Sequence, residues 1–333
     1  STDNATHSIT FKGDLTNDGI INFESNTGDG EMEAFFTGAT NNQLVSNSTT
    51  DLYTLDLNKG TDQTFSLTVS SSADNFDITA NTDLLRIRNG TLILKDNINL
   101  SRVHGGTNWD VGFDQNTNGA FIVDGATVDM TNSNALVVYG LFQLKSGSIT
   151  IGAQGMVNRE DGEIEINGGT MDVSKYRISG TTLTHRGTFT MTGGIMNIDT
   201  TFGQSSPNLA PFSMPFSGQS LTMTGGTINI KYGESDNGTS KNGGIQIGVD
   251  PSNANISGGT WNITTKSPEN TNFGIASSVP FWNMNVKSAS GTGTGKAIIR
   301  DLDADIQGTI ITVKAEDLEI LNNFSMESNN NPT

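Results

Sequence analysis

The chain contains no cysteine among its 333 residues. A disulfide framework, a thiolate metal site and a cysteine nucleophile are therefore excluded. It has only three histidines, and because His7, His104 and His185 lie far apart in the sequence, a histidine-rich zinc site is not expected. No stretch approaches 18 consecutive apolar residues, so no segment is expected to cross a membrane as a helix.

Basic residues are also scarce. The chain has 18 Lys and Arg against 35 Asp and Glu, which gives a net charge of −17. Nucleic acids and bare anionic membranes are therefore not expected as partners, because binding phosphate requires clustered Lys and Arg. An acidic surface suits an extracellular protein and weak binding of divalent cations.

Apolar residues make up only 33% of the chain, while glycine alone accounts for 39 residues. Such a composition is typical either of a disordered chain or of a repeat protein that buries a narrow core in every repeat. Regular alternation of apolar and polar residues over much of the chain favours the repeat protein.

A ten-residue template recurs along the chain. Apolar residues occupy positions 1, 3, 8 and 10, two small residues occupy positions 5 and 6, and a Thr-like residue follows them. The copies are residues 85–94, 121–130, 142–151, 164–173, 189–198, 221–230 and 254–263, with a degenerate copy at 304–313. The alternation predicts two short half-buried strands, and glycine permits a corner between them. Neither strand could bury its apolar face alone, so the copies must stack.

The spacing of the copies predicts the size of one coil. The Thr-like positions Thr127, Ser148 and Thr170 follow one another after 21 and 22 residues. Longer steps elsewhere, beginning with the step from Thr91 to Thr127, indicate loop insertions, of which 202–218 and 232–244 are two. A meander or propeller of hairpins is the alternative, but the repeat is too short for four strands per blade and its spacing is too variable for a closed ring.

The sequence therefore predicts an all-β fold, a right-handed parallel β-helix (β-solenoid) with coils of about 22 residues and loop insertions. We expect the β-helix to cover residues 51–322. An irregular or capping β region at 1–50 would precede it, and a polar tail or linker at 323–333 would follow it.

Three motifs in the amino-terminal part carry a family resemblance: residues 51–59 (DLYTLDLNK), residues 64–69 (TFSLTV) and Asn89-Gly90-Thr91. Together with residues 11–19 (FKGDLTNDG) and the later Gly-Gly-Thr strands, they resemble β-helix repeat regions of large secreted surface proteins of Bacteroidota. Those proteins are adhesin-like substrates of type IX secretion. The resemblance implies a segment of a larger protein on the outer surface of a Gram-negative bacterium. Its partners would be surface polysaccharides, other cell-surface proteins or the secretion machinery.

Polar residues recur at the outward middle position of the second strand of the template. In a stack they would form a row with a spacing of about 4.8 Å per coil. The row could bind sugar hydroxyls or metal ions, or it could be a hydrogen-bonded ladder that only stabilises the stack. Its members are Asp129, Thr150, Asp172, Asn197, Asn229 and Asn262. Trp282 is a further candidate for stacking on sugar rings, unless it simply belongs to one more strand of the coil.

Two groups of residues with oxygen-bearing side chains are candidate calcium sites. Asp114, Asn116 and Asn118 place oxygens at alternate positions before Gly119, as in the first half of a calcium loop. The twelfth position is Gly125 rather than a bidentate Glu, so a polar turn is the alternative. The second group would carry three like charges on one strand face, which repel unless they are solvated or bound to a cation. It consists of Asp301, Asp303 and Asp305.

No catalytic constellation stands out in the sequence. Parallel β-helices include polysaccharide lyases and hydrolases, whose sites combine carboxylates with Arg or Lys. Asn81-Thr82-Asp83 resembles a polygalacturonase motif, but the remaining motifs do not follow in order, and Arg86 and Arg88 come too early. We therefore expect a non-enzymatic structural or adhesive protein, with a polysaccharide-active β-helix enzyme, a lyase or glycoside hydrolase, as the alternative.

Overall fold

The fold is a β-solenoid of about 8 turns with about 1% helix, as seen in a computed structural model of the chain. The prediction of an all-β fold of stacked parallel coils is confirmed. The structure describes residues 7–23, 31–72, 75–79, 85–96, 98–100, 109–131, 135–152, 155–159, 161–179, 186–199, 210–231, 235–236, 245–265, 272–288, 297–300 and 320–327. The chain divides into two compact units. Unit 1 comprises Ser1–Gly155 and Asp161–Met171, and unit 2 comprises Met156–Glu160 and Asp172–Thr333.

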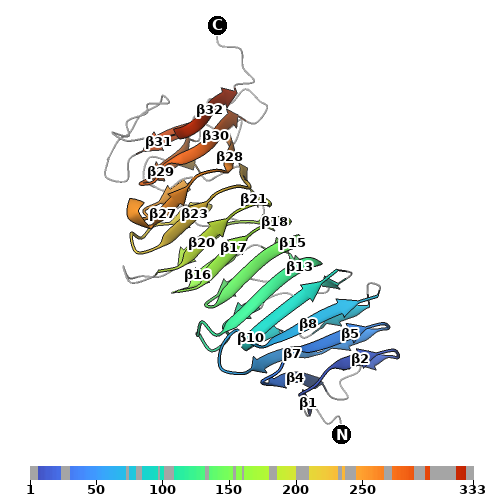
Figure 1. Cartoon of the computed structure of the whole chain (residues 1–333). Coiled ribbons are helices and arrows are strands. Elements are labelled where there is room, and N and C mark those ends of the chain that lie inside the picture. The colour runs from blue at the N-terminus through green and yellow to red at the C-terminus, as the bar shows by residue number, and fades with distance from the viewer. Residues whose placement is uncertain are drawn as a thin grey trace. The chain divides into compact units, whose positions relative to one another are not determined.

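A coil of unit 1 contains up to three strands, one in each of three sheet regions. Parallel pairing joins β4 to β7, β5 to β8 and β6 to β9, and the arrows of β4 and β7 run side by side in Figure 1. The first region contains β1 (His7–Phe11), β4 (Met32–Gly38), β7 (Thr54–Lys59), the start of β10 (Leu85–Lys95), β12 (Trp109–Val111) and β14 (Leu136–Val138). The second contains β2 (Leu15–Asn17), β5 (Asn42–Ser46), β8 (Ser66–Ser71), the end of β10 and the starts of β13 (Gly119–Met130) and β15 (Leu141–Ile151), and then β17 (Glu163–Ile166). The third contains β3 (Ile21–Asn22), β6 (Thr50–Leu52), β9 (Phe76–Ile78), β11 (Asn99–Leu100) and the ends of β13 and β15.

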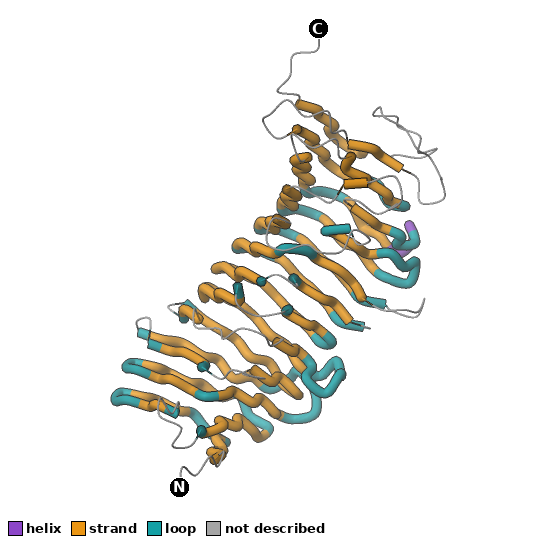
Figure 2. The backbone as a smooth tube through the Cα atoms, turned by 180° about the vertical axis from the view of Figure 1, so that it is seen from behind, coloured by secondary structure: helices purple, strands orange, loops and turns teal. Residues whose placement is uncertain are grey.

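Unit 2 repeats this arrangement, and Figure 2 shows its strands in orange with a short 3-10 helix (Pro251–Asn253) in purple. The first region contains β16 (Met156–Arg159), β19 (Tyr176–Ser179), β22 (Phe212–Met214), β26 (Ile245–Ile247), β29 (Asn272–Ser277) and β31 (Ala297–Arg300), with β25 (Ser235–Asp236) antiparallel to β29. The second contains β20 (Thr188–Met191), β23 (Ser220–Met223) and β27 (Ala254–Ile256). The third contains β21 (Ile195–Asp199), β24 (Thr227–Lys231), β28 (Thr260–Thr265), β30 (Phe281–Ser288), β32 (Ile320–Glu327) and, from Asp172 onward, β18 (Thr170–Val173).

The third strand in each coil corrects one detail of the sequence analysis. Residues 202–218 were expected to be a loop insertion, but Phe212–Met214 forms β22, and the Phe212 side chain is fully buried. The template describes only two strands per coil and does not include the first one. The strand β22 has three residues and lies between Pro211 and Pro215, which is too short for alternation to be recognised. Residues 201–209 lie outside the described part of the chain.

The register of the strands confirms most of the predicted template and corrects its first copy. Thr127 pairs with Ser148, and Thr227 pairs with Thr260, as predicted. Thr91, however, pairs with Ala120, so the copy at 85–94 spans the corner between the first and second sheet regions. The copies from 121–130 to 254–263 span the corner between the second and third, and the copy at 304–313 lies outside the described residues. Both corners are flanked by apolar alternation, so the sequence pattern alone does not distinguish them.

The predicted glycine corners have a steric origin. Gly147 has a φ of 85° and Gly226 a φ of 77°, in the left-handed region that side chains with a Cβ rarely adopt. A Cβ at Gly226 would lie 2.7 Å from the carbonyl oxygen of Gly193 in the preceding coil. Glycine is therefore required at this corner both by backbone conformation and by the close approach of the neighbouring coil.

Among the side chains that the structure describes, the interior of each unit is filled by the inward-facing residues of the strands. In unit 1 the inward residues of β7 and the start of β10 are aliphatic, and Leu55, Leu57 and Ile87 have no exposed surface, while Trp109, Phe121 and Phe142 form a short aromatic row. In unit 2 an aromatic row runs through successive coils: ring centroids lie 4.9 Å apart from Tyr176 to Phe212 and 5.0 Å from Phe212 to Trp261. Trp261 occupies an apolar position of the template copy at 254–263, and its 2% exposure confirms that this position faces the core.

Candidate functional site

Four of the predicted outward residues come together in unit 2 as a continuous chain of side-chain hydrogen bonds. Asn197 Nδ2 donates to Asp172 Oδ1 at 2.7 Å, and Asn229 Nδ2 donates to Asn197 Oδ1 at 2.7 Å. Asn262 Nδ2 donates to Asn229 Oδ1 at 2.8 Å, and Asn285 Nδ2 donates to Asn262 Oδ1 at 2.8 Å. We call Asp172, Asn197, Asn229, Asn262 and Asn285 the amide ladder.

The register of the third sheet region builds this ladder. Asn197 pairs with Asn229, Asn229 with Asn262, and Asn262 with Asn285, each on the next parallel strand. Because the same position recurs in each coil, neighbouring amides lie within hydrogen-bonding reach. Asn285 was not among the predicted members. Asn285 lies between the apolar residues Met284 and Val286, and this alternation could have identified it. The segment does not match the ten-residue template, so it was not counted as a copy.

The ladder has one direction. Each Asn donates to the preceding member of the ladder, Asn197, Asn229 and Asn262 also accept from the following one, and Asp172 at the end is a carboxylate that only accepts when ionised. Aligned amide hydrogen bonds polarise one another, which strengthens each bond in the row. The arrangement matches the stack-stabilising ladder considered in the sequence analysis. Binding of a ligand along it stays a prediction.

The other predicted binding residues are placed separately. Asp129 belongs to unit 1, pairs in register with Thr150, and accepts a local hydrogen bond from the Thr131 backbone N–H at 2.9 Å. Trp282 follows the buried Phe281 on β30 and is half-buried. Because side chains alternate along a strand and Phe281 is buried, Trp282 is directed away from the core.

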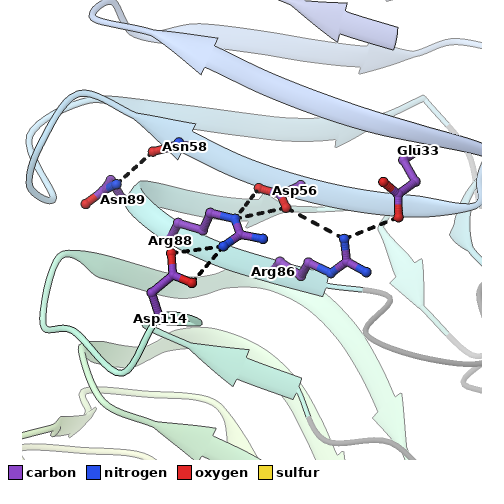
Figure 3. Close-up of polar contacts among 7 residues, drawn as sticks. All are labelled: Glu33, Asp56, Asn58, Arg86, Arg88, Asn89 and Asp114. Carbon is purple, nitrogen blue, oxygen red and sulfur yellow. Dashed lines mark hydrogen bonds and ion pairs between the residues drawn. The ribbon is translucent and has the colours of Figure 1, made fainter. Parts of the chain in front are cut away.

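A network of charged residues covers the outer face of the first sheet region in unit 1 (Figure 3). We call Glu33, Asp56, Arg86, Arg88 and Asp114 the Arg88 network. Arg88 Nε donates to both oxygens of Asp56 at 3.0 Å, and Arg88 Nη1 donates to Asp114 Oδ1 and Oδ2 at 2.7 and 2.9 Å. Arg86 Nη1 lies 3.2 Å from Glu33 Oε1 and 3.9 Å from Asp56 Oδ2.

Asp56 is at the centre of the Arg88 network. Its side chain is only 1% exposed, and burial raises the pKa of its carboxyl, while the positive charges of Arg88 and Arg86 oppose that shift. The Arg88 guanidinium also lies 4.6 Å from the centroid of the Phe113 ring, a cation–π distance. A buried carboxylate of this kind needs its partners, because an uncompensated charge is costly away from water.

The Arg88 network bears on the predicted calcium loop. Both carboxylate oxygens of Asp114 face Arg88, and Asn116 Oδ1 accepts from the Asn118 backbone N–H at 2.9 Å. The side-chain oxygens of Asp114 and Asn116 thus have other partners here, in a polar turn. Within the described ranges, no group of three or more His, Cys, Asp or Glu side chains could hold a metal ion. Asp301, Asp303 and Asp305 lie outside the described residues.

Arg86 and Arg88 stand out in the sequence, but their partners were not predicted. Asp56 lies 32 residues before Arg88, and β7 pairs with β10 so that Asp56 and Arg86 are opposite one another. Both segments show the same alternation in the sequence: Asp56 lies between two leucines, and Arg86 lies between Leu85 and Ile87. This pattern identifies the two residues as partners only when the register of the two strands is known.

The comparisons with known proteins add no relative. No protein-family model, no curated protein and no solved structure matches the chain. Among the residues that the structure describes, no helix is long and apolar enough to cross a membrane.

Proposed function

We propose that this chain is a non-enzymatic structural and adhesive β-solenoid of the extracellular cell surface, part of a larger secreted protein. The observation that carries the proposal is the amide ladder, in which outward side chains of successive coils are bonded to one another. Such a row stiffens the stack and presents the same chemical groups at a regular spacing. A repeating surface of this kind suits a repeating ligand.

The ladder retains hydrogen-bonding capacity for a ligand. A primary amide has two N–H donors and two lone pairs on its oxygen. Asn229 uses one donor toward Asn197 and one acceptor position toward Asn262. The second N–H and the second lone pair are suited to sugar hydroxyls, which both donate and accept. The partner we propose is therefore an extended surface polysaccharide, with Trp282 as a stacking position.

The charged groups support a structural role. In the Arg88 network, carboxylates and guanidinium groups are bonded to each other, so the lone pairs that acid–base chemistry would use are engaged. The extracellular location and the larger parent protein rest on the resemblance of the sequence to secreted Bacteroidota surface proteins, and the acidic composition is compatible with both.

The proposal is tested with the purified chain on a glycan array and, in parallel, in a polysaccharide-degradation screen. We expect binding to at least one extended glycan without release of product. Asn229→Ala should weaken this binding, and Asn255→Ala, which removes an exposed amide on the neighbouring β27, should leave it unchanged. New reducing ends or unsaturated products would contradict the non-enzymatic role. Loss of binding in chelator would support calcium at the candidate calcium sites.

A further inference from the structure

A lysine is buried at the end of β7 in unit 1. The Lys59 side chain is among the largest fully buried ones, and the residue is 1% exposed. Its Nζ donates to Asn42 Oδ1 at 2.6 Å and to the Thr37 carbonyl oxygen at 3.2 Å, and both acceptors are uncharged. Burial lowers the pKa of Lys59, although the negative charge of Asp14 opposes the shift. Burial therefore favours the neutral amine, which is the nucleophilic form.

The amide that faces this amine is polarised from both sides. Asn42 is 8% exposed, and its Oδ1 also faces Thr40 Oγ1 at 3.3 Å. Its Nδ2 donates to Asp14 Oδ1 at 3.2 Å. Asp14 also accepts from the Gln43 backbone N–H at 2.9 Å, and this bond, followed by the one from Asn42, lowers the pKa of Asp14. A carboxylate therefore contacts the amide nitrogen, while two donors contact the amide oxygen.

We propose that Lys59 and Asn42 join in an intramolecular isopeptide bond. The distance from Nζ to Oδ1 is 2.6 Å, and a C=O bond is about 1.23 Å long, so Nζ is no farther than about 3.8 Å from the amide carbon. That limit is close to the separation of reacting atoms in a near-attack geometry, about 3–3.5 Å. The buried site holds the two groups together without any change in the fold.

The reaction is a transamidation that needs no other reactant. The lone pair of neutral Nζ attacks Asn42 Cγ and forms a tetrahedral carbon, whose negative oxygen is stabilised by the Thr40 hydroxyl. The Asp14 carboxylate carries a proton from Nζ to Nδ2, the nitrogen it already contacts. The bond between Cγ and Nδ2 then breaks, the carbonyl re-forms, and one ammonia leaves. One C–N bond forms and one breaks, with no change of oxidation state.

The bond would join two consecutive coils. Asn42 begins β5, whereas Lys59 ends β7, which pairs with β4. A covalent link between them prevents these coils from separating, and it removes conformational freedom from the unfolded chain in the way a disulfide does. The inference is independent of the proposed function, because it concerns a self-modification of unit 1 rather than a ligand.

Mass spectrometry of the intact wild-type chain tests the proposal. We expect a mass below that of the sequence by about 17 Da, which is one ammonia. After denaturation, trypsin should fail to cut at Lys59. A protease that cuts before Asp51 and Asp56 should leave the fragments with Asn42 and Lys59 joined. A wild-type chain with the full sequence mass would overturn the proposal.

Variants assign the loss of mass to these residues. Lys59→Met removes the nucleophile and should restore the full mass, and Lys231→Met, at a surface lysine paired with Asp199, should retain the deficit. Asp14→Ala should lower the cross-linked fraction. An Asn-Gly succinimide also releases ammonia, so a deficit that persists in Lys59→Met, or one found with separate fragments, would overturn the isopeptide bond. The intact masses and the protease fragments can be measured on denatured protein, so the variants need not be stable.

Discussion

On the outer surface of unit 1, charged side chains of neighbouring strands pair with one another, as in the Arg88 network. On the third sheet region of unit 2, uncharged amides make a comparable connection through the amide ladder. The two regions share the parallel register that places equivalent positions in adjacent coils. The comparison shows that the stack requires partners for its outward polar groups, but not a particular kind of polar group.

The interiors of the two units differ in the extent of their aromatic packing. In unit 1 the inward positions of β7 and β10 are aliphatic and a shorter aromatic row runs from Trp109 to Phe142, whereas in unit 2 the aromatic row continues from Tyr176 to Phe281. Aromatic rings packed edge to face bury more area per residue than leucine and add specific geometry. Substitutions inside unit 2 should therefore have larger effects than substitutions of surface partners in either unit.

The largest expected effect comes from the aromatic row. Trp261→Ala removes a ring that lies 5.0 Å from Phe212 and 5.4 Å from Phe281, and we expect unit 2 to lose about 3–5 kcal/mol of stability. Hydrogen–deuterium exchange of the β24 and β28 amides would measure the change. Trp282→Ala is the matched control, because this tryptophan is half-buried and should cost only about 1 kcal/mol. Equal effects would contradict the assignment of Trp261 to the core.

A smaller loss is expected when the Arg88 network is broken. Asp56→Ala removes the buried carboxylate from between Arg86 and Arg88, and we expect unit 1 to lose about 2–3 kcal/mol. Exchange of the β7 and β10 amides would report it. Asp199→Ala breaks the more exposed contact with Lys231 in unit 2 and should cost at most about 1 kcal/mol. A loss of the same size in both variants would mean that burial of Asp56 adds nothing.

Interrupting the amide ladder should cost less again. Asn229→Ala removes one donated and one accepted hydrogen bond, and we expect a loss of about 1–2 kcal/mol, spread over β21, β24 and β28. Asn255→Ala on β27 serves as the control. Slower exchange in β24 after Asn229→Ala would be the opposite of this expectation. That result would show that the ladder strains the stack.

The smallest expected effect is a dependence of stability on pH, which a contact between charged groups should show and a contact between amides should not. The hydrogen bond from Lys95 keeps the pKa of Asp124 below its usual value. A carboxyl with a depressed folded pKa contributes stability above its unfolded pKa of about 3.9 and loses it as pH falls through the folded value. The difference between wild type and Asp124→Asn, at most about 1 kcal/mol near neutral pH, should shrink below about pH 4. Melting curves at several pH values would measure it.

The amide ladder supplies the contrast for that measurement. Asparagine amides do not titrate, so the cost of Asn229→Ala should change less with pH than the cost of Asp124→Asn. If both differences shrink together in acid, the loss would come from the stack as a whole and not from the Lys95–Asp124 contact.

Much of the candidate site was predictable because it repeats. Asp172, Asn197, Asn229 and Asn262 occupy one position of a ten-residue template, and the parallel stack brings that position together in successive coils. The contacts of Asp114 were not predictable in the same way. Its spacing with Asn116 and Asn118 indicated calcium, but its partner Arg88 comes from another coil, 26 residues away.

The sequence by itself determined the parallel coil, its glycine corners and the inward positions such as Trp261, because alternation and the conformational freedom of glycine are local properties of the chain. Only the tertiary structure decided that Thr91 lies opposite Ala120, that Asp56 meets Arg88, and that Lys59 meets Asn42. The physical reason is the register of the strands. Each coil contains loops of different length, so the number of residues between partners varies, and only the packing of one coil on the next selects the pairs.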